Sequence, residues 1–351
     1  MRLKGKNPVP VLLGLAFFIV VCVAVAINSI SGSFSDSTEG LFEEDSKKTL
    51  DTGKLQCPLD GTLVDSLPQD RPIAVVIDNL PRARPQSGLT KADLVYETLA
   101  EGGVTRLLAV YYHGEASSVG PIRSARPYFI ELAGGLNAIL VHSGGSPEAL
   151  DLLKNSNFPH LDEFRHPRYF WRISQRRPPH NLYSSISNLH KLARDYGLNN
   201  EVKVPSFNFK SDEVKEGIGE KKSLQSNEVK IHFPRGYEVT YFYDPEEQTY
   251  CRFVDEKPHL DAATNSQLSA RNIIVQFVKT NVVDGQGRLE MELTGHGRAL
   301  VFSGKKVIEA VWQKSSTDRP TTYKTMDGET VELLPGQSWI EIIPQNTKVS
   351  F

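Results

Sequence analysis

The chain has 351 residues, of which 39% are hydrophobic and 23% are charged, and its formal net charge is −2. This length exceeds one small domain and fits about two. The 16 Phe, 12 Tyr and 3 Trp exclude wholesale disorder, and only three Cys exclude a disulfide scaffold. A mean hydropathy of −0.32 excludes a protein with many membrane spans. The near-zero net charge gives no indication of a nucleic-acid partner.

The N-terminus predicts a membrane anchor. Three basic residues among the first six precede an apolar run over residues 9–27, and about 20 apolar residues are enough to span a bilayer. Positive charge stays on the cytoplasmic side of a membrane. We therefore expect a cytoplasmic stub over residues 1–8, a single membrane-spanning segment (signal-anchor) over residues 9–30, and an extracytoplasmic location for the rest of the chain. The predicted location is the cell membrane.

Three other interpretations of this apolar segment stay open. A cleaved signal peptide would fit the pattern Ala24–Ala26, although no polar stretch precedes it. Lipid modification of Cys22 would anchor the chain covalently, although the residues before it lack the small side chains expected there. A buried core helix is the last alternative, and the basic stub in front of it argues against that reading.

Residues 31–70 are predicted to form a disordered linker. The stretch is rich in Ser, Thr and Gly, carries five acidic residues within residues 36–45, and has few apolar side chains with which to build a core. Cys57 lies within it, and Cys251 lies far downstream. Export permits a disulfide between them, and the alternative is two unpaired thiols.

An α/β domain is predicted over residues 71–210. Short apolar runs alternate with helical segments, as in an α/β layer structure. Ser146 and Pro147 mark a helix start, since Ser caps the first turn and Pro fits its first position. Gly197 closes the last helix. The expected strands cover residues 71–78, 92–98, 104–112 and 137–142, and the expected helices cover residues 126–133, 147–154 and 184–196.

A charged connection over residues 211–228 leads to a predicted β-rich domain over residues 229–351. Turn signals such as Asp284-Gly285 and Asp327-Gly328 separate segments of β-forming residues. The expected strands cover residues 239–243, 250–254, 272–278, 289–293, 299–302, 307–312, 330–334 and 339–343. The predicted fold class is mixed (α+β): an N-terminal α/β layered domain followed by a β-rich C-terminal domain, behind one N-terminal membrane-spanning segment.

Arginine and lysine are distributed unevenly. Residues 71–177 hold eleven Arg and two Lys, whereas the rest of the chain holds eight Arg and nineteen Lys. Arginine offers a planar fork for carboxylates or phosphates and tolerates partial burial, whereas lysine suits a solvated surface. Residues 164–180 alone carry five Arg, four aromatic residues and no acid. The pattern predicts a pocket for an anionic ligand; the alternative is that these arginines pair with acids of the same domain.

Polar residues that end buried segments form the predicted ligand-binding site. Asp78 ends a buried strand, and ligands of α/β layers gather at the carboxyl ends of strands. Arg123 and Arg126 flank a helix start, where free N–H groups favour an anion. His142 precedes a Ser-Gly-Gly-Ser turn at the next helix start. The expected ligand-binding residues are Asp78, Asn79, Glu97, Glu101, Arg106, Arg123, Arg126, His142, His180 and Asn181.

Structural roles for the same residues stay open, since Asp78 could cap a turn and His142 could be a hydrogen-bonded core histidine. The G-x-S-x-G elbow, the P-loop, H-E-x-x-H and zinc-type cysteine spacing do not occur in the sequence. We therefore assign no catalytic residue and predict neither a metal site nor a cofactor.

Several motifs occur in a fixed order along the chain: residues 71–79, 83–88, 92–97, 101–106, 120–126 and 179–181, Asp327-Gly328, and residues 335–340. Together they resemble the YerB-like family of bacterial envelope proteins. The resemblance extends from about Cys57 to the C-terminus. It implies a mixed α/β N-terminal domain, a β-rich C-terminal domain and a Gram-positive type of bacterium, and it implies no activity. Many members of this family resemble lipoproteins, whereas this sequence lacks a convincing lipidation motif.

Three functions are compatible with these features. The first is an extracytoplasmic binding protein whose arginine-rich domain binds an anionic cell-wall component or a cell-wall enzyme. The second is a hydrolase or transferase acting on an envelope polymer, with Asp78 or Glu101 as base and His142 or His180 as acid. The third is a structural assembly protein whose arginines are internal ties. The expected partners are the membrane and a wall polymer or wall enzyme, and no nucleic acid.

Overall fold

The computed structural model describes residues 53–210 and 224–351. The predicted cytoplasmic stub, the membrane-spanning segment over residues 9–30 and most of the predicted linker lie outside the described residues. Within the described ranges, no helix combines the length and the apolar character that a membrane span needs.

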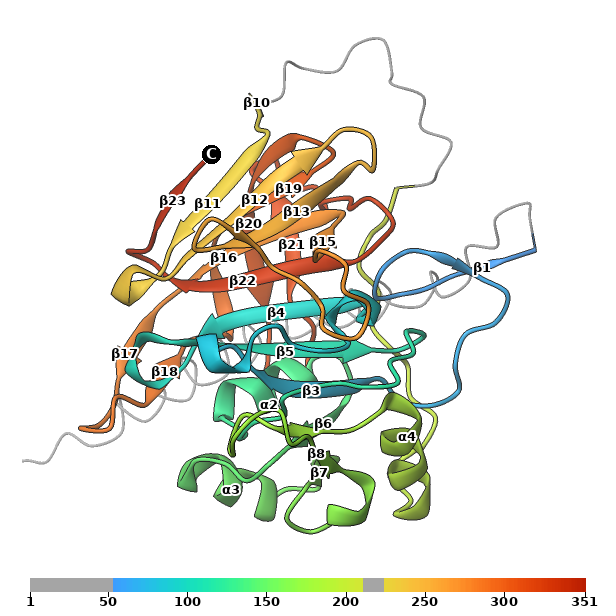
Figure 1. Ribbon diagram of the computed structural model, residues 1–351. Helices are drawn as coiled ribbons and strands as arrows, with labels where there is room; N and C mark the ends of the chain where they lie inside the picture. Colours follow the sequence, from blue (N-terminus) through green and yellow to red (C-terminus); the bar gives the residue numbers. More distant parts are fainter. Residues whose placement is uncertain (1–52, 211–223) are drawn as a thin grey trace, which may run out of the picture. The chain divides into compact units, whose positions relative to one another are not determined.

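The first described range holds short strands and three helices (Figure 1). Its strands are β1 (Leu55–Gln56), β2 (Leu63–Val64), β3 (Ile73–Asp78), β4 (Leu94–Leu99), β5 (Thr105–Tyr111), β6 (Ile139–His142), β7 (His160–Asp162), β8 (Trp171–Arg172) and β9 (Leu182–Tyr183). Its helices are α2 (Pro127–Gly134), α3 (Pro147–Lys154) and α4 (Ile186–Asp195).

The second described range is almost entirely β-structure, as predicted. Its strands are β10 (Leu224–Gln225), β11 (Glu228–His232), β12 (Glu238–Asp244), β13 (Thr249–Val254), β14 (Lys257–Pro258), β15 (Ser269–Ala270), β16 (Asn272–Val278), β17 (Thr280–Val282), β18 (Leu289–Met291), β19 (Gly295–Ser303), β20 (Lys306–Lys314), β21 (Thr322–Thr325), β22 (Ser338–Pro344) and β23 (Lys348–Ser350).

Most predicted elements form close to the expected residues because their local signals are strong. The side chain of Ser146 caps α3 by accepting a hydrogen bond from the Ala149 N–H, and Gly197 follows α4 with a φ of +66°. The predicted strand over residues 330–334 is wrong. Only isolated bridges form there, at Thr330 and Leu333, because Leu333 pairs with Phe209 of the first range and not with a neighbouring strand.

The central sheet has eleven strands and contains strands from both predicted domains. Its order is β10-β20-β19-β16-β22-β4-β5-β3-β6-β7, and β21 pairs with β20. The junction is β22, which lies parallel both to β16 and to β4. The mixed fold is thus confirmed, with the helices in the first region and β-structure in the second, and one sheet runs through both regions. Sequence patterns within each region could not reveal a pairing between residues about 240 apart.

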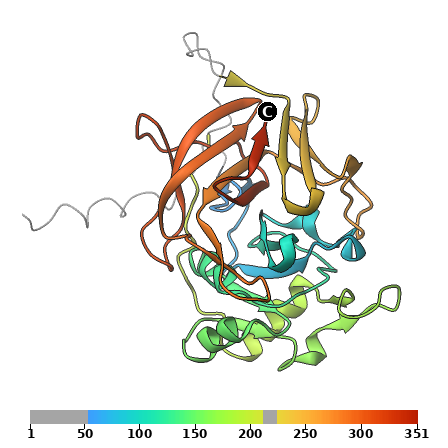
Figure 2. The same cartoon turned by 90° about the vertical axis from the view of Figure 1, so that its left-hand side faces the viewer.

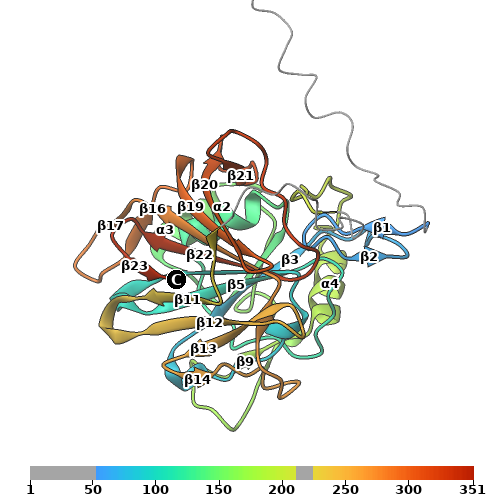
Figure 3. The ribbon, with the colours of Figure 1, turned by 90° about the horizontal axis from the view of Figure 1, so that it is seen from above.

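A smaller sheet with the order β14-β13-β12-β11-β23, in which β15 pairs with β13, packs against the C-terminal part of the central sheet. Figures 2 and 3 show these strands facing the central sheet. The ring of Tyr241 on β12 lies 6.4 Å from that of Trp339 on β22, and Phe302 on β19 lies 5.3 Å from Phe351. Because β4 is covered on both faces, its residues form a continuous buried run without alternation.

The predicted linker ends earlier than expected. Residues 55–64 form the β1–β2 hairpin, and Cys57 and Leu59 are completely buried. The Phe207 N–H donates to the Pro58 carbonyl, and the Gly336 N–H donates to the Asp60 carbonyl. The few apolar residues of this stretch therefore complete a core built from distant segments, which composition alone does not show. Cys57 and Cys251 are both free thiols, so the predicted alternative of two unpaired cysteines is confirmed.

A buried arginine joins the two sheets. Glu97 on β4 and Glu341 on β22 are direct register partners, and two like charges in such positions repel each other. Arg252 on β13 donates to both carboxylates, and all three side chains have no exposed surface. Its guanidinium carbon lies 4.3 Å from the Trp339 ring centroid and 5.1 Å from that of Tyr241. Hydrogen bonds to two carboxyl groups and contacts with two aromatic faces thus replace the water that this cation lost on folding.

A closed ring of hydrogen bonds continues from Arg252. Its Nε donates to His259 Nδ1 (3.1 Å), and His259 Nε2 lies 2.7 Å from the side-chain oxygen Oε1 of Gln86. The Gln86 side-chain amide donates to Asn79 Oδ1 (2.8 Å). The Asn79 side-chain amide donates to Glu97 (2.9 Å), which accepts from Arg252. Burial and the neighbouring Arg252 keep the pKa of His259 well below its usual range, so this histidine is a neutral link. Both regions of the chain contribute to the ring.

Glu341 carries the unfavourable part of this arrangement. Burial and the negative charge of Glu97 raise its pKa to about 8, although Arg252 opposes that shift. Its Oε2 has no hydrogen-bond partner among the described residues, and a bare buried carboxylate oxygen is costly. The folded chain therefore holds a proton on Glu341 that the unfolded chain releases near pH 4.5.

We expect Arg252→Met to destabilise the chain by about 3–5 kcal/mol, because it leaves the Glu97 carboxylate buried without a cation and removes a hydrogen-bond donor from Glu341. Urea unfolding monitored by circular dichroism measures this loss. Arg298→Met is the matched control: this arginine is exposed and only stacks on Phe277, so it should cost about 1 kcal/mol or less. Equal losses in the two variants would contradict the role of Arg252.

We expect Glu341→Gln to change how stability depends on pH. A raised pKa in the folded state means that the contribution of Glu341 is full below about pH 4.5 and declines up to about pH 8, by at most about 1.4 kcal/mol per pH unit. Glutamine has no proton to lose, so the variant should gain on the wild type as the pH rises. Urea unfolding free energies from pH 5 to pH 8.5 test this, and parallel profiles would disprove it.

Candidate functional site

The parallel strands β3, β6 and β7 end at one edge of the central sheet. Ile73 pairs with Ile139, and Leu140 pairs with His160, so the carboxyl ends of the three strands lie side by side. This edge collects the last residues of these strands and the turn that leads into α3. Asp78 ends β3 and the turn after His142 follows β6, so both lie at this edge.

Asp78 organises the polar groups at this edge. It is 1% exposed, and its Oδ2 lies 2.7 Å from His180 Nδ1 and 3.2 Å from Arg123 Nε. Backbone bonds place these partners: the Asp78 N–H donates to the Pro121 carbonyl, and the Arg123 N–H donates to the Val76 carbonyl. Asp78 therefore orients both a cation and an imidazole and is more than a turn cap.

A pocket of about 820 Å³ opens beside Arg123. Apolar surface comes from Phe164 and Leu150, and polar surface comes from arginine, serine and backbone groups. The volume lies within the range of about 300–1,000 Å³ that is usual for small-ligand sites. We call this cavity the strand-end pocket. Its lining consists of Ile122, Arg123, Ser124, Ser143, Gly144, Gly145, Leu150, Asp162, Phe164, Arg172, Pro178, Pro179 and Leu182.

The rim of the strand-end pocket comes from the arginine-rich segment over residues 164–180. Arg172 lies on the rim, 41% exposed in its side chain, and donates to Glu163 (3.1 Å) and to Asn181 (3.1 Å). Arg165 and Arg177 are exposed, and neither has an ion-pair partner within the described residues. The ring of Phe164 is 73% exposed. Exposed guanidinium groups beside an aromatic ring suit an anion that also carries an apolar face.

Glu101 holds two other predicted site residues. It forms ion pairs with Arg126 and with Arg106, the latter at 3.5 Å. Burial acts to raise the pKa of Glu101, but the hydrogen bond from Arg126 and the charges of both arginines lower it below its ordinary value. Neither arginine is among the residues that line the strand-end pocket. This cluster therefore ties the β4–β5 turn to the start of α2.

His142 is a hydrogen-bonded core histidine, which is the structural role that the sequence left open. It is fully buried; its Nδ1 lies 2.8 Å from the Gly144 carbonyl and its Nε2 lies 3.0 Å from His160 Nδ1. Burial lowers the pKa of both histidines, and that of His160 falls to about 4. The pair is thus neutral at physiological pH, and its hydrogen bonds fix the turn that forms one wall of the pocket.

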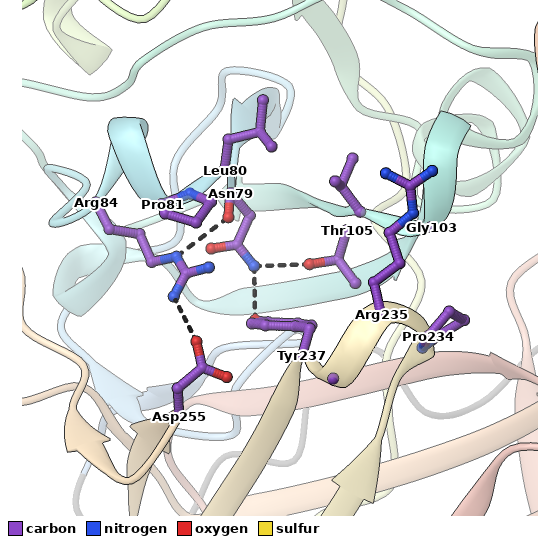
Figure 4. Close-up of a pocket in the computed structure, with 12 residues that line it drawn as sticks. Asn79, Leu80, Pro81, Arg84, Gly103, Thr105, Pro234, Arg235, Tyr237 and Asp255 are labelled. Atoms are coloured by element: carbon purple, nitrogen blue, oxygen red, sulfur yellow. Dashed lines mark hydrogen bonds and ion pairs between the residues drawn. The ribbon is translucent and has the colours of Figure 1, made fainter.

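Asn79 and Glu97 belong to the buried ring around Arg252. Asn79 also lines a smaller cavity of about 250 Å³, where it donates to the Tyr237 hydroxyl (2.8 Å) and where Arg84 lies 3.8 Å from Asp255 (Figure 4). That volume falls below the usual range for a ligand pocket. We therefore place the candidate ligand in the strand-end pocket and leave Glu97, which has no exposed surface, outside it.

Sequence reasoning missed several pocket residues. Asp162 is the last residue of β7, a strand of only three residues that carries no clear β-pattern. Phe164 and Arg172 fall in a segment noted for its arginines, but nothing in the sequence showed which of these faces a cavity. The short apolar stretch around His160 is followed by two acidic residues, and this was the one signal in the sequence that another strand ends there.

Comparison with known proteins supports the arrangement of two regions. Residues 60–199 match the family "Protein of unknown function (DUF3048) N-terminal domain", and residues 229–340 match its C-terminal domain. The protein named "Putative lipoprotein YerB" from Bacillus subtilis is 34% identical over 296 residues, which cover 83% of this chain and 87% of that protein. The crystal structure of YerB from Bacillus subtilis superimposes with a TM-score of 0.75 at 32% identity, covering 85% of this chain and all of that one.

Proposed function

This chain belongs to the DUF3048 family of YerB-like proteins, and we propose on that basis that it is an envelope-associated protein that binds an anionic wall component. The name of the Bacillus subtilis relative supports an envelope location. Either the predicted membrane span over residues 9–30 or lipid modification of Cys22 would hold the folded part at the membrane. The binding site we propose is the strand-end pocket.

The observation that carries this proposal is the position of the pocket. It lies where three parallel strands end, has a volume of about 820 Å³, and contains the guanidinium groups of Arg123 and Arg172. A fragment of a few sugar or polyol phosphate units would fill such a volume. Fixed backbone groups of Ser143–Gly145 and the rigid Pro178–Pro179 segment give the walls a defined shape before a ligand arrives.

The charge balance favours an anion at the rim over one at the floor. Arg123 is already paired with Asp78, and Asp162 adds a negative charge to the floor. Arg172 is the exposed arginine of the lining, and Arg165 and Arg177 are exposed elsewhere on the segment over residues 164–180, which holds no acid. Phosphate or carboxylate groups would therefore contact Arg165, Arg172 and Arg177, while the uncharged part of the ligand enters beside Phe164.

We expect the full chain to bind a teichoic-type polyol phosphate polymer in isothermal titration calorimetry, with heats that fall as salt is added. The exposed positions of Arg165 and Arg172 make Arg165→Ala/Arg172→Ala safe for folding, and the double variant should bind at least about tenfold more weakly. Arg319→Ala, an exposed arginine between β20 and β21, should bind normally. Absence of heat with phosphate-bearing and carboxylate-bearing polymers alike, or an unchanged double variant, would refute the proposal.

A hydrolase or transferase is the second candidate, and the Asp78–His180 pair favours it. Asp78 fixes His180 Nδ1, and His180 Nε2 has no hydrogen-bond partner among the described residues. This geometry is that of an oriented general base or acid. The exported wall polymer that binds in the pocket would then be the substrate.

If this second function holds, the full chain should turn over a wall fragment, and His180→Gln should lower the rate at least about a hundredfold. His296→Gln, an exposed histidine on β19, should leave the rate unchanged. Mass spectrometry of fragments incubated with each variant measures this. Binding without any turnover would exclude the enzyme and leave the binding protein.

A further inference from the structure

Four side chains that can ligate a metal converge at the opposite end of the sheet from the strand-end pocket. Asp93 directly precedes β4, and His113 lies two residues after β5, whereas Cys57 and Asp60 lie on the β1–β2 turn. One ligand atom from each of the four lies within 4.8 Å of every other. Cys57, Asp60 and Asp93 are buried, and His113 is 28% exposed in its side chain. The exposed edge of His113 offers a path for an ion.

We propose that Cys57, Asp60, Asp93 and His113 form a tetrahedral Zn²⁺ site. Sulfur, imidazole nitrogen and carboxylate oxygen are the ligands that Zn²⁺ binds in proteins. Four protein ligands leave no open position, so the site would be structural. It would fasten the β1–β2 hairpin to the β4–β5 hairpin, which supply two ligands each.

The contacts of His113 Nε2 suit a metal at the centre of the four side chains. This one nitrogen lies 2.7 Å from Asp93 Oδ1, 2.9 Å from Asp60 Oδ2 and 3.2 Å from Thr62 Oγ1, and the Cys57 sulfur approaches the same side chain. One N–H group makes one well-directed hydrogen bond. A cation at the centre would satisfy all these groups at once. The ligand atoms would then move apart to about 3.3 Å, the spacing that bonds of about 2.0–2.3 Å to Zn²⁺ require.

The other oxygen of each carboxylate is already held. Asp60 Oδ1 accepts from the Thr62 N–H (3.0 Å) and hydroxyl (2.8 Å). Asp93 Oδ2 accepts from the backbone N–H groups of Tyr112 (2.5 Å) and Gly114 (3.4 Å). Each carboxylate is thus oriented from outside and presents its remaining oxygen inward, which is the outer-shell support that metal ligands need.

The backbone is shaped for this convergence. Cys57 and Asp60 have the i, i+3 spacing of the paired ligands in zinc-binding turns, and the Gly61 N–H donates to the Cys57 carbonyl (2.8 Å). Gly61 has a φ of +73°, and a Cβ there would lie 2.4 Å from the ring of Phe209. A Cβ on Gly114 would lie 1.9 Å from the Lys91 carbonyl, so only glycine lets the strand end beside His113 approach Asp93. This turn pairs Cys with Asp, so it lacks the paired cysteines that mark a zinc site in a sequence.

Metal analysis of the full chain tests the site. Chain purified without chelators should contain about one zinc per molecule by inductively coupled plasma mass spectrometry. Cys57→Ser and Asp60→Asn should lower zinc occupancy at least about tenfold. Cys251→Ser and Asp65→Asn are the matched controls, since Cys251 lies on β13 and the Asp65 side chain is 92% exposed, and both should keep the metal.

A spectroscopic test does not depend on the variants folding. Chain stripped of metal and titrated with Co²⁺ should show the intense d–d bands of tetrahedral cobalt and a sulfur-to-cobalt charge-transfer band, and Zn²⁺ should displace both. The charge-transfer band should persist in Cys251→Ser and disappear in Cys57→Ser. Wild-type chain without zinc and without a tetrahedral cobalt spectrum would overturn the proposal, as would a Cys57→Ser variant that keeps full occupancy. In either case the four residues are only an ion-paired cluster around a protonated His113.

Discussion

The structure depends on one buried cation, Arg252, held between two carboxylates that face each other on neighbouring strands. Arg252 binds both Glu97 and Glu341, which lie opposite each other where β22 pairs with β4. That pairing makes a single sheet from two regions of the chain. Since Arg252 itself lies on the smaller sheet, the same contact also fixes how the two sheets pack. Separating the two regions would leave a buried charge without its partner or expose it to water.

The two ends of the strands in the central sheet carry different chemical groups. At the carboxyl ends of β3, β6 and β7, Asp78 holds a cation and an imidazole beside a pocket with an arginine-rich rim. At the other end, cysteine, histidine and two aspartates converge, with one ligand atom from each within 4.8 Å of the others. An open pocket suits an exchangeable ligand, whereas a closed set of four donors suits an ion that stays. We therefore interpret the first end as the functional one and the second as a fastening.

The many arginines of residues 71–177 have two different structural situations. Arg106 and Arg126 bind Glu101, and Arg123 binds Asp78, so these three are internal ties, as the structural alternative held. Arg165 and Arg177 are exposed and have no ion-pair partner within the described residues. Arginine suits both uses, because its planar fork satisfies a buried carboxylate as well as a ligand's anionic group. Composition alone therefore could not distinguish a scaffold from a binding surface.

The sequence by itself determined most helices and strands, the polar edge that includes Asp78 and the family, because caps, turns and continuous apolar runs act over a few residues. It also indicated the arginine-rich segment. Only the tertiary structure decided that both regions share one sheet, that His142 is a core residue and that Arg252, Phe164 and Arg172 matter. It also decided which acid faces which arginine and that Cys57 meets His113. These outcomes depend on contacts between segments far apart in the chain, and local physical signals carry no record of such partners.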